Sequence, residues 1–316
     1  MGVDRTRGGW PHNRRMTHGL ARCVGIDWGT THRRGVVLDG AGRCIARAQD
    51  AQGLLAARGR FGAALREMLA ELGVDDAPLP VLLSGMVGSA QGWRDAGYLD
   101  APLPLAHLRE HRVPLGAEAP RAAIVPGVAL RRSGRIVDVM RGEETQLLGA
   151  AELGARDGWF LLPGTHTKWV RLEGAAIVDF ATYLTGELYA LLGAQGTLAL
   201  LLQGQDEEHR PAAFAQGLDA AGEAVLSNAL FGLRARVVGA SLPAADARSF
   251  LSGLLIGAEW HDLRRRCAGS LPAHATLVAA PGLAQRQADA ARHFGVALQV
   301  LDPDAVQVAA LAALTR

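Results

Sequence analysis

The stretch CVGIDWGTT, residues 23–31, decides the fold, because a short apolar run there ends in a carboxylate, a glycine and two hydroxyl side chains. Further apolar runs follow at residues 35–38 and near residues 44–48. Runs of this length, separated by Gly, Asp and Thr, predict a strand, a tight polar turn and two more strands. We call residues 27–31 the first turn.

The same design returns in the second half of the chain as WFLLPGTHTKWVRLEG, residues 159–174. Aligning Gly29 with Gly164 also aligns Thr30 with Thr165, and an acidic residue followed by glycine closes both hairpins. A repeat at half-chain distance predicts two similar α/β domains that each open with a hairpin. Chance similarity of two short hairpins is the alternative.

The rest of the chain alternates helical and strand patterns, as α/β domains do. Alanine- and leucine-rich segments with helical spacing lie at residues 56–72, 142–153, 188–203, 213–235, 248–267 and 305–315. Buried strands are expected at residues 81–83, 122–125 and 275–279. A length of 316 residues suits two domains. We place them at residues 21–138 and 139–316, with a cleft between them, after a disordered basic tail at residues 1–20.

Composition excludes several classes of protein. Hydrophobic residues at 49% and charged residues at 20% describe an ordinary globular chain, and no apolar run approaches the roughly 18 residues that span a bilayer. A net charge of +2 gives no electrostatic argument for nucleic acid or an anionic membrane as partner. Three widely spaced cysteines suggest neither a disulfide framework nor a metal pair, and the N-terminus lacks the apolar core of a signal peptide, so we expect a cytoplasmic protein.

The first turn has the groups that bind a phosphate and its metal ion. Gly29 lets backbone N–H groups approach closely, and Thr30 and Thr31 add hydroxyl donors. Asp27 is the candidate ligand of Mg2+ or of its water shell. An ordinary hairpin turn, stabilised by its own side chains, is the alternative interpretation.

Residues 163–168, which we call the second turn, offer the same chemistry. Gly164, Thr165 and Thr167 repeat the glycine and the hydroxyls, and His166 adds an imidazole. Lys168 is the only lysine of the chain, which indicates a role that a bulkier guanidinium would not fill. Two such turns can hold the β- and γ-phosphates of ATP.

Glu143 and Glu144 are the candidate catalytic residues, at the start of a helical segment shortly before the second turn. Phosphoryl transfer to an alcohol needs a carboxylate that accepts the hydroxyl proton. Acidic residues also occur at helix starts because they complement the helix dipole, which is the alternative explanation.

Two further segments are candidate binding sites. The loop after the strand at residues 81–83 is rich in glycine and serine, so its backbone can reach the carboxylate or hydroxyls of a bound acid, with an arginine to neutralise it. These substrate candidates are Ser84, Gly85, Met86, Gly88, Ser89, Arg34 and Tyr98. The small-residue turn Pro281-Gly282-Leu283 lets an adenine ring lie against the backbone, although a plain helix cap explains it as well. The sequence has neither a P-loop nor a G-x-G-x-x-G motif.

Residues 27–31, 142–144, 164–165 and 281–283 resemble, in this order, the first phosphate segment, the catalytic segment, the second phosphate segment and the adenosine segment of actin/hexokinase-type sugar kinases. Those kinases carry their catalytic aspartate in a G-D-Q-Q-like segment. Here glutamate follows the glycine instead, and the choice between Glu143 and Glu144 stays open.

More closely, the segments IDWGTTHRR, SGMVGSAQGW, DVMRGEETQLLGA, PGTHTKWV and FLSGLLIGAE resemble the 2-dehydro-3-deoxygalactonokinase family. The resemblance covers nearly the whole chain from Cys23 and implies two ribonuclease-H-like domains that bind ATP and Mg2+ in an interdomain cleft. It further implies transfer of phosphate from ATP to the 6-hydroxyl of 2-dehydro-3-deoxy-D-galactonate in galactonate catabolism. The alternatives are a kinase for another keto-deoxy sugar acid, a phosphatase-like relative that uses water as acceptor, and an actin-type nucleotide-dependent protein. We expect a sugar acid and ATP as partners and leave the oligomeric state open.

Overall fold

The computed structural model describes residues 20–206 and 208–316, so the predicted tail lies almost wholly outside the described residues. Two compact units are formed. The first contains the residues up to Gly97, Leu108–Gly127 and Leu311–Arg316, and the second contains Tyr98–His107 and Val128–Ala310. This division differs from the boundary expected between residues 138 and 139, which would cut through a strand of a hairpin.

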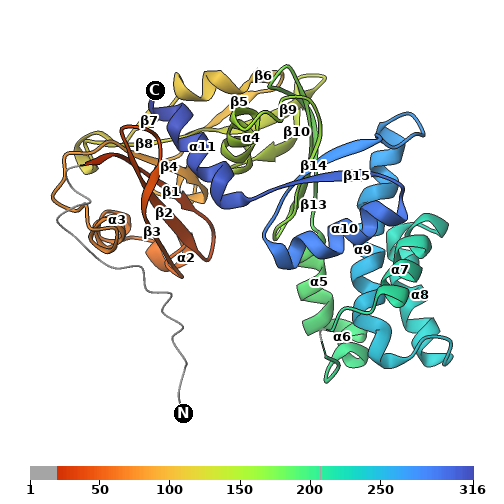
Figure 1. Cartoon of the computed structure of the whole chain (residues 1–316). Coiled ribbons are helices and arrows are strands. Elements are labelled where there is room, and N and C mark those ends of the chain that lie inside the picture. The colour runs from red at the N-terminus through yellow and green to blue at the C-terminus, as the bar shows by residue number, and fades with distance from the viewer. Residues whose placement is uncertain (1–19, 207) are drawn as a thin grey trace, which may run out of the picture. The chain divides into compact units, whose positions relative to one another are not determined.

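The sheet of the first unit has the strand order β3-β2-β1-β4-β8-β7 (Figure 1). The strands β1, β2 and β3 are antiparallel neighbours, whereas β4 is parallel to β1 and β8 is parallel to β4. The bounds are β1 (Ala21–Trp28), β2 (Arg33–Asp39), β3 (Cys44–Asp50), β4 (Val81–Gly85), β7 (Val113–Pro114) and β8 (Ala122–Ile124), with helices α2 (Leu54–Ala57) and α3 (Phe61–Glu71). Side chains of α3 and of the sheet, Met68 and Trp28 among them, form the core of this unit.

The main sheet of the second unit repeats this arrangement, with the order β15-β14-β11-β12-β13-β6. Here β11, β12 and β13 are the antiparallel strands, β14 is parallel to β11, and β15 is parallel to β14. The bounds are β6 (Leu103–Pro104), β11 (Gly158–Leu162), β12 (Thr167–Glu173), β13 (Ala176–Tyr183), β14 (His274–Val278) and β15 (Ala297–Leu301). Five strands therefore have the same order and direction in both sheets, as the repeat in the sequence indicated, and only the short strands β7 and β6 lie at opposite edges.

A small sheet of order β10-β9-β5 also belongs largely to the second unit. Its strands are β5 (Tyr98–Asp100), β9 (Gly127–Arg132) and β10 (Arg135–Met140). Because β9 and β10 pair along their whole length, the chain changes unit before this hairpin rather than inside it. The helices α4 (Glu143–Glu152) and α11 (Pro303–Thr315) follow the hairpin and end the chain, respectively.

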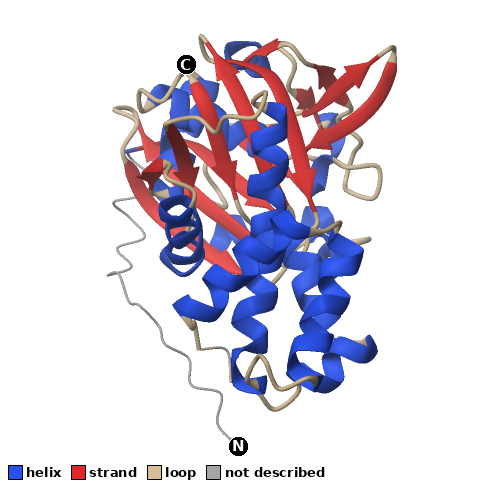
Figure 2. Ribbon diagram, turned by 90° about the vertical axis from the view of Figure 1, so that its right-hand side faces the viewer, coloured by secondary structure: helices blue, strands red, loops and turns tan. Residues whose placement is uncertain are grey.

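Between β13 and β14 the second unit inserts a group of helices, which are coloured green to blue in Figure 1. In Figure 2 all helices are blue, and this group extends away from the strands. The helices of this group are α5 (Thr185–Ala194), α6 (Gly196–Leu202), α7 (Pro211–Glu223), α8 (Leu226–Val238) and α9 (Ala247–Arg266), and α10 (Pro281–His293) follows β14. The long pattern predicted at residues 188–203 is divided into α5 and α6 at Gln195, whose backbone is extended, and Gly196 follows it with a φ of 78°. No helix in the described part of the chain is long and apolar enough to cross a membrane.

Glycines allow α7 and α9 to pack backbone against backbone. A Cβ on Gly217 would lie 2.2 Å from the carbonyl oxygen of Phe250, and one on Gly253 would lie 2.0 Å from that of Phe214. Neither approach is possible with a larger residue, so these two positions fix how the helices meet. The site described below depends on α9, which supplies part of its wall.

Candidate active site

The first turn is held by a glycine that the sequence analysis missed. Gly53, immediately before α2, donates its N–H to the carbonyl oxygen of Thr31 at 3.0 Å, and Leu54 donates to that of Gly29 at 2.9 Å. A Cβ on Gly53 would lie only 2.4 Å from the carbonyl carbon of Thr31. The turn's carbonyl groups are thereby tied to α2, while the side chains of Thr30 and Thr31 stay exposed.

The second turn is held in the same way by the start of α5. A Cβ on Gly186 would lie 2.5 Å from the carbonyl oxygen of Gly164, and Glu187 donates its N–H to the carbonyl oxygen of Thr165 at 2.9 Å. His166 also contacts this helix, with its Nε2 2.7 Å from Glu187 Oε2. The repeated element is therefore a hairpin together with the glycine-led start of the following helix.

In the first unit, Asp27 lies beside the predicted substrate loop. It pairs in register with Ser84 of β4 and with Arg34 of β2, and an Arg34 guanidinium nitrogen lies 3.9 Å from Asp27 Oδ2. Gly85 has a φ of 85°, and a Cβ there would lie 2.8 Å from the Trp28 carbonyl oxygen and 3.2 Å from Asp27 Oδ1. Only glycine leaves this space beside the carboxylate, and the structure thus brings the metal, anion and loop candidates together.

The remainder of the loop forms a short helical turn, Met86–Gly88, of which Gly88 is buried. Ser89 is 9% exposed, and its hydroxyl has no hydrogen-bond partner among the described residues. Tyr98 belongs to the second unit, where the guanidinium of Arg141 lies 4.3 Å from the centre of its ring. Tyr98 is therefore a neighbour of the segment that carries the candidate catalytic glutamates.

Glu143 is the more accessible of these two glutamates. Its side chain is 23% exposed and lies with Oε1 3.8 Å from the Lys168 ammonium. Its other oxygen accepts the Arg141 N–H at 3.0 Å, which fixes the carboxylate at the first residue of α4. A carboxylate held in this way can still accept a proton from a bound alcohol.

Glu144 is fully buried and accepts the N–H of Gly142 at 2.7 Å. Burial, together with the neighbouring charge of Glu143, raises the pKa of Glu144 to about 8. At neutral pH it is therefore mostly a neutral acid at the start of α4. The two candidates have different environments, and Glu143 is the one suited to act as a base.

Lys168 is buried at 5% exposure and does not extend from the exposed part of the second turn. Its ammonium donates to the carbonyl oxygen of Val139 at 3.1 Å and to Thr182 Oγ1 at 2.8 Å. Thr182 Oγ1 in turn donates to Asp138 at 2.6 Å. This network places the positive charge beside Glu143, and a direct contact of Lys168 with phosphate stays a prediction.

A cavity of the second unit joins the second turn to the start of α10. It has a volume of about 120 Å³ and is partly open to solvent. The lining residues come from the second turn, α5, α9 and α10: Pro163, Gly164, Thr167, Thr185, Gly186, Tyr189, Ser252, Leu255, Ile256, Leu283, Arg286 and Gln287. The predicted phosphate and adenine segments thus meet at one cavity through Gly164 and Leu283.

The other two adenine candidates, Pro281 and Gly282, are exposed at the start of α10. A Cβ on Gly282 would meet no atom within 4 Å, so packing within the unit does not require glycine there. The sequence analysis missed the cavity residues of α5 and α9, because no local motif marks them.

A buried acid supports the wall of this cavity. Glu259 of α9 is 1% exposed and accepts hydrogen bonds from Thr185 Oγ1, from Thr167 and, at 3.3 Å, from Trp169 Nε1. Burial raises the pKa of Glu259 to about 7. Glu259 therefore fixes two threonines that line the cavity, although it does not line the cavity itself.

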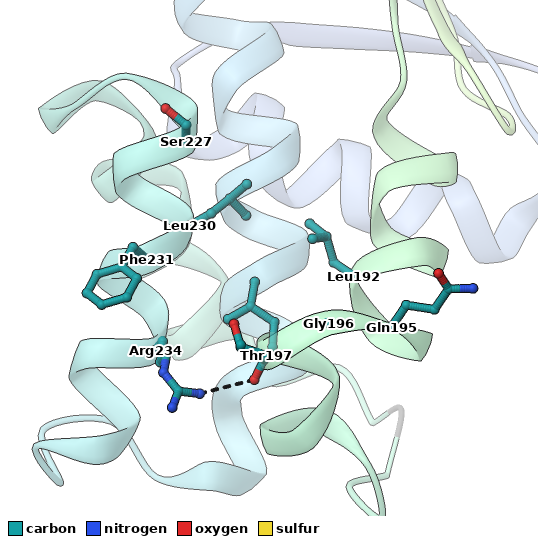
Figure 3. A pocket seen from close by; sticks show the side chains of 9 residues that line it. Leu192, Gln195, Gly196, Thr197, Ser227, Leu230, Phe231 and Arg234 are labelled. Atoms are coloured by element: carbon teal, nitrogen blue, oxygen red, sulfur yellow. Dashed lines mark hydrogen bonds between the residues drawn. The ribbon is translucent and has the colours of Figure 1, made fainter.

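A second hollow lies among α5, α6 and α8 and contains none of the predicted site residues (Figure 3). Arg234, one of its lining residues, donates to the carbonyl oxygen of Thr197 at 3.2 Å. No acidic residue lines this hollow. It is not a candidate for the reaction.

The donor set suits Mg2+ better than a tightly ligated metal. Among the described residues, no three His, Cys, Asp or Glu side chains are grouped as metal ligands. Mg2+ is commonly bound by one or two carboxylates together with substrate phosphates and water. Asp27, whose neighbour Gly85 carries no side chain that would crowd the carboxylate, fits that role.

Comparison with known proteins agrees with this geometry. The family described as 2-keto-3-deoxy-galactonokinase matches residues 27–314. A probable 2-dehydro-3-deoxygalactonokinase of Rhizobium meliloti (strain 1021) is 36% identical over 92% of this chain and 95% of its own length. The 2-dehydro-3-deoxygalactonokinase of Escherichia coli (strain K12) is 38% identical over 87% of this chain and 91% of its own length.

A solved structure agrees as well. The crystal structure of a 2-dehydro-3-deoxygalactonokinase-type protein from Sinorhizobium meliloti has 35% identity and a TM-score of 0.84, and the match covers 93% of this chain and 98% of that chain. The expected actin/hexokinase-type α/β fold is confirmed. The chain belongs to the 2-keto-3-deoxy-galactonokinase family.

Proposed function

We propose that the protein is an ATP-dependent kinase that phosphorylates the 6-hydroxyl of 2-dehydro-3-deoxy-D-galactonate. The observation that carries the proposal is the cavity of the second unit, which joins Gly164 to Leu283 as the phosphates and base of one nucleotide require. The names of the relatives supply the substrate. We expect the enzyme to act in the cytoplasm on small molecules.

The two units have different tasks in this reaction. In the second unit, the second turn binds phosphate and Glu143 accepts the proton of the attacking hydroxyl, while Lys168 holds the carboxylate in place. In the first unit, the first turn binds phosphate and the loop Ser84–Ser89, with Arg34, binds the sugar acid. The reaction requires both sets of residues to act on the same ATP and acceptor.

Mg2+ neutralises phosphate charge when it is bound, and Asp27 is the residue that would hold it. The chain itself contributes positioning and fixed dipoles, which account for most of the catalysis of phosphoryl transfer. The glycines at positions 53 and 186 serve this purpose, because they fix the backbone of the two turns before any ligand binds.

A coupled assay that measures ADP formation tests the proposal. ATP and Mg2+ are supplied with a panel of aldonic and 2-keto-3-deoxy sugar acids, and we expect the galactonate-derived acid to give the highest kcat/KM. A higher kcat/KM for another keto-deoxy acid would correct the substrate. Equal ADP formation with and without any acid would indicate water as the acceptor and refute the kinase.

A further inference from the structure

The lining of the cavity in the second unit includes a buried carboxamide, that of Gln287. This residue of α10 is 3% exposed, and its oxygen has no hydrogen-bond partner among the described residues. A buried acceptor without a partner is costly, and folded proteins seldom keep one unless a ligand or water satisfies it. Gln287 also lines the cavity, so a molecule bound there can supply the missing donor.

The surroundings of Gln287 suit a flat apolar ring with a polar edge. Leu283 precedes Gln287 by four residues, so both side chains lie on one face of α10. Leu255 and Ile256 of α9 complete an apolar wall. In such surroundings a single amide decides which edge of a ring is accepted, because any polar edge left unpaired there is penalised.

The cavity has a direction as well. Gly164 and Thr167 of the second turn, the predicted phosphate-binding segment, form one part of its lining, and Leu283 and Gln287 of α10 form another. Arg286 adds a cation to the lining, and its guanidinium lies 5.8 Å from the centre of the Tyr189 ring. A nucleotide bound with its phosphates at the second turn would direct its base to α10.

We propose that Gln287 selects the adenine base, with its carboxamide oxygen accepting a hydrogen bond from the exocyclic amine and its NH2 group donating to a neighbouring ring nitrogen. Glutamine and adenine form this paired contact because adenine presents a donor next to an acceptor. Hypoxanthine and guanine present a carbonyl oxygen in place of the amine, which would face the amide oxygen. The inference rests on the proposed use of ATP and adds the residue that distinguishes ATP from other purine nucleotides.

The test compares Gln287→Met with the wild-type enzyme. Methionine keeps the length and unbranched shape of the side chain but removes both hydrogen-bonding groups. We expect kcat/KM for ATP to fall about ten- to a hundredfold, the usual worth of such a contact, while kcat/KM for inosine triphosphate changes little. The same pattern is expected in the dissociation constants of ADP and inosine diphosphate measured by calorimetry.

The matched control is Gln285→Met, the same change on the exposed face of the same helix, where the side chain bonds only to Asp289 at 3.0 Å. We expect no change in nucleotide preference for this variant. Thermal unfolding separates binding from a structural role: since the Gln287 oxygen has no partner in the fold, Gln287→Met is expected to unfold at the wild-type temperature or above it.

Each outcome has one meaning. A Gln287→Met enzyme that keeps the wild-type ratio of ATP to inosine triphosphate overturns the assignment of Gln287 and leaves the kinase intact. A wild-type protein that binds ADP more tightly than inosine diphosphate, with Gln287→Met removing the difference, supports the assignment even if no sugar acid is phosphorylated, and the proposed function alone then fails. Absence of any nucleotide binding overturns both.

Discussion

Replacing Glu143 by glutamine is expected to lower kcat about 100-fold or more, because general base catalysis typically contributes a factor of about 10² to 10⁴. This range corresponds to about 3–5 kcal/mol of transition-state stabilisation. The glutamine oxygen can still accept the N–H of Arg141, so the start of α4 is kept. The variant thus removes the base without removing its position.

The same change withdraws the charge beside Lys168. At 3.8 Å and an effective dielectric constant of about 20, this attraction is about 4 kcal/mol before solvation is counted. Glu143 is partly exposed and Lys168 keeps two hydrogen bonds, so we expect the free energy of unfolding to fall by only about 1 kcal/mol. Urea unfolding measures this cost separately from kcat.

Glu144→Gln is the matched control. Because Glu144 is mostly protonated at neutral pH, an amide reproduces its neutral state and its bond from Gly142, and kcat should stay within about threefold of wild type. Steady-state kinetics with both substrates, with calorimetry of ATP binding, measure both variants. A near-normal Glu143→Gln enzyme beside an impaired Glu144→Gln enzyme would assign the base to Glu144, and two near-normal enzymes would refute a carboxylate base in this segment.

Three further changes test the supporting structure. Lys168→Met is expected to lower kcat at least about tenfold through misplacement of Glu143, and steady-state kinetics that show only a raised KM for ATP would instead indicate a phosphate ligand. Gly186→Ala places a Cβ 2.5 Å from a carbonyl oxygen of the second turn and should raise KM for ATP about tenfold. Gly193→Ala on the same helix is the control, because its added Cβ lies 3.6 Å from the nearest atom and should leave KM unchanged. Equal KM values for the two variants would contradict this. Glu259→Gln should flatten the pH dependence of the free energy of unfolding. Because the pKa of Glu259 is raised to about 7, the wild type is stabilised below about pH 4.5 and loses this stabilisation as pH rises through 7, by up to about 1.4 kcal/mol per pH unit. Urea unfolding from pH 5 to 8 that gives both proteins the same change of unfolding free energy with pH would refute this.

The sequence was sufficient for features that depend on neighbouring residues. The two hairpins, the strand at residues 81–85 and the helix that begins at Glu143 were predictable, because period and turn residues act over a few positions. The order of the glycine-threonine turns along the chain was enough to identify the repeat. The same local signals failed at residues 188–203, where the extended backbone of Gln195 and the positive φ of Gly196 divide one pattern into two helices.

Features that depend on distant contacts could not be predicted. Gly53 and Gly186 resemble any other glycine at the start of a helix, and their importance arises only from the turn that folds back against each of them. Glu259 and Gln287 are polar residues in helical segments, which is typical of a solvated face, yet both are buried. The sequence did contain one signal of buried Gln287. Leu283 and Ala290 lie on the same face of the helix, so helical spacing predicts an apolar residue at position 287, and a glutamine stands there instead.

The repeat also explains why the single lysine lies beside Glu143, the candidate base. When the two turns are aligned, Arg33 stands where Lys168 stands, and both cations are buried at the start of the second strand of their hairpin. Arg33 faces Asp50 across β2 and β3 and bonds to it at 2.8 Å, so its charge is neutralised within its own hairpin.

In the second hairpin the corresponding partner across β12 and β13 is Thr182, a neutral residue. The charge of Lys168 is therefore not neutralised across the strands, and its ion pair is with Glu143 of α4. Restoring a carboxylate by Thr182→Asp should draw the ammonium away from Glu143, and we expect kcat to fall while ATP binding, measured by calorimetry, is unchanged. An unchanged kcat would mean that the position of Lys168 has no part in holding the base, and the difference between the two hairpins would then be structural alone.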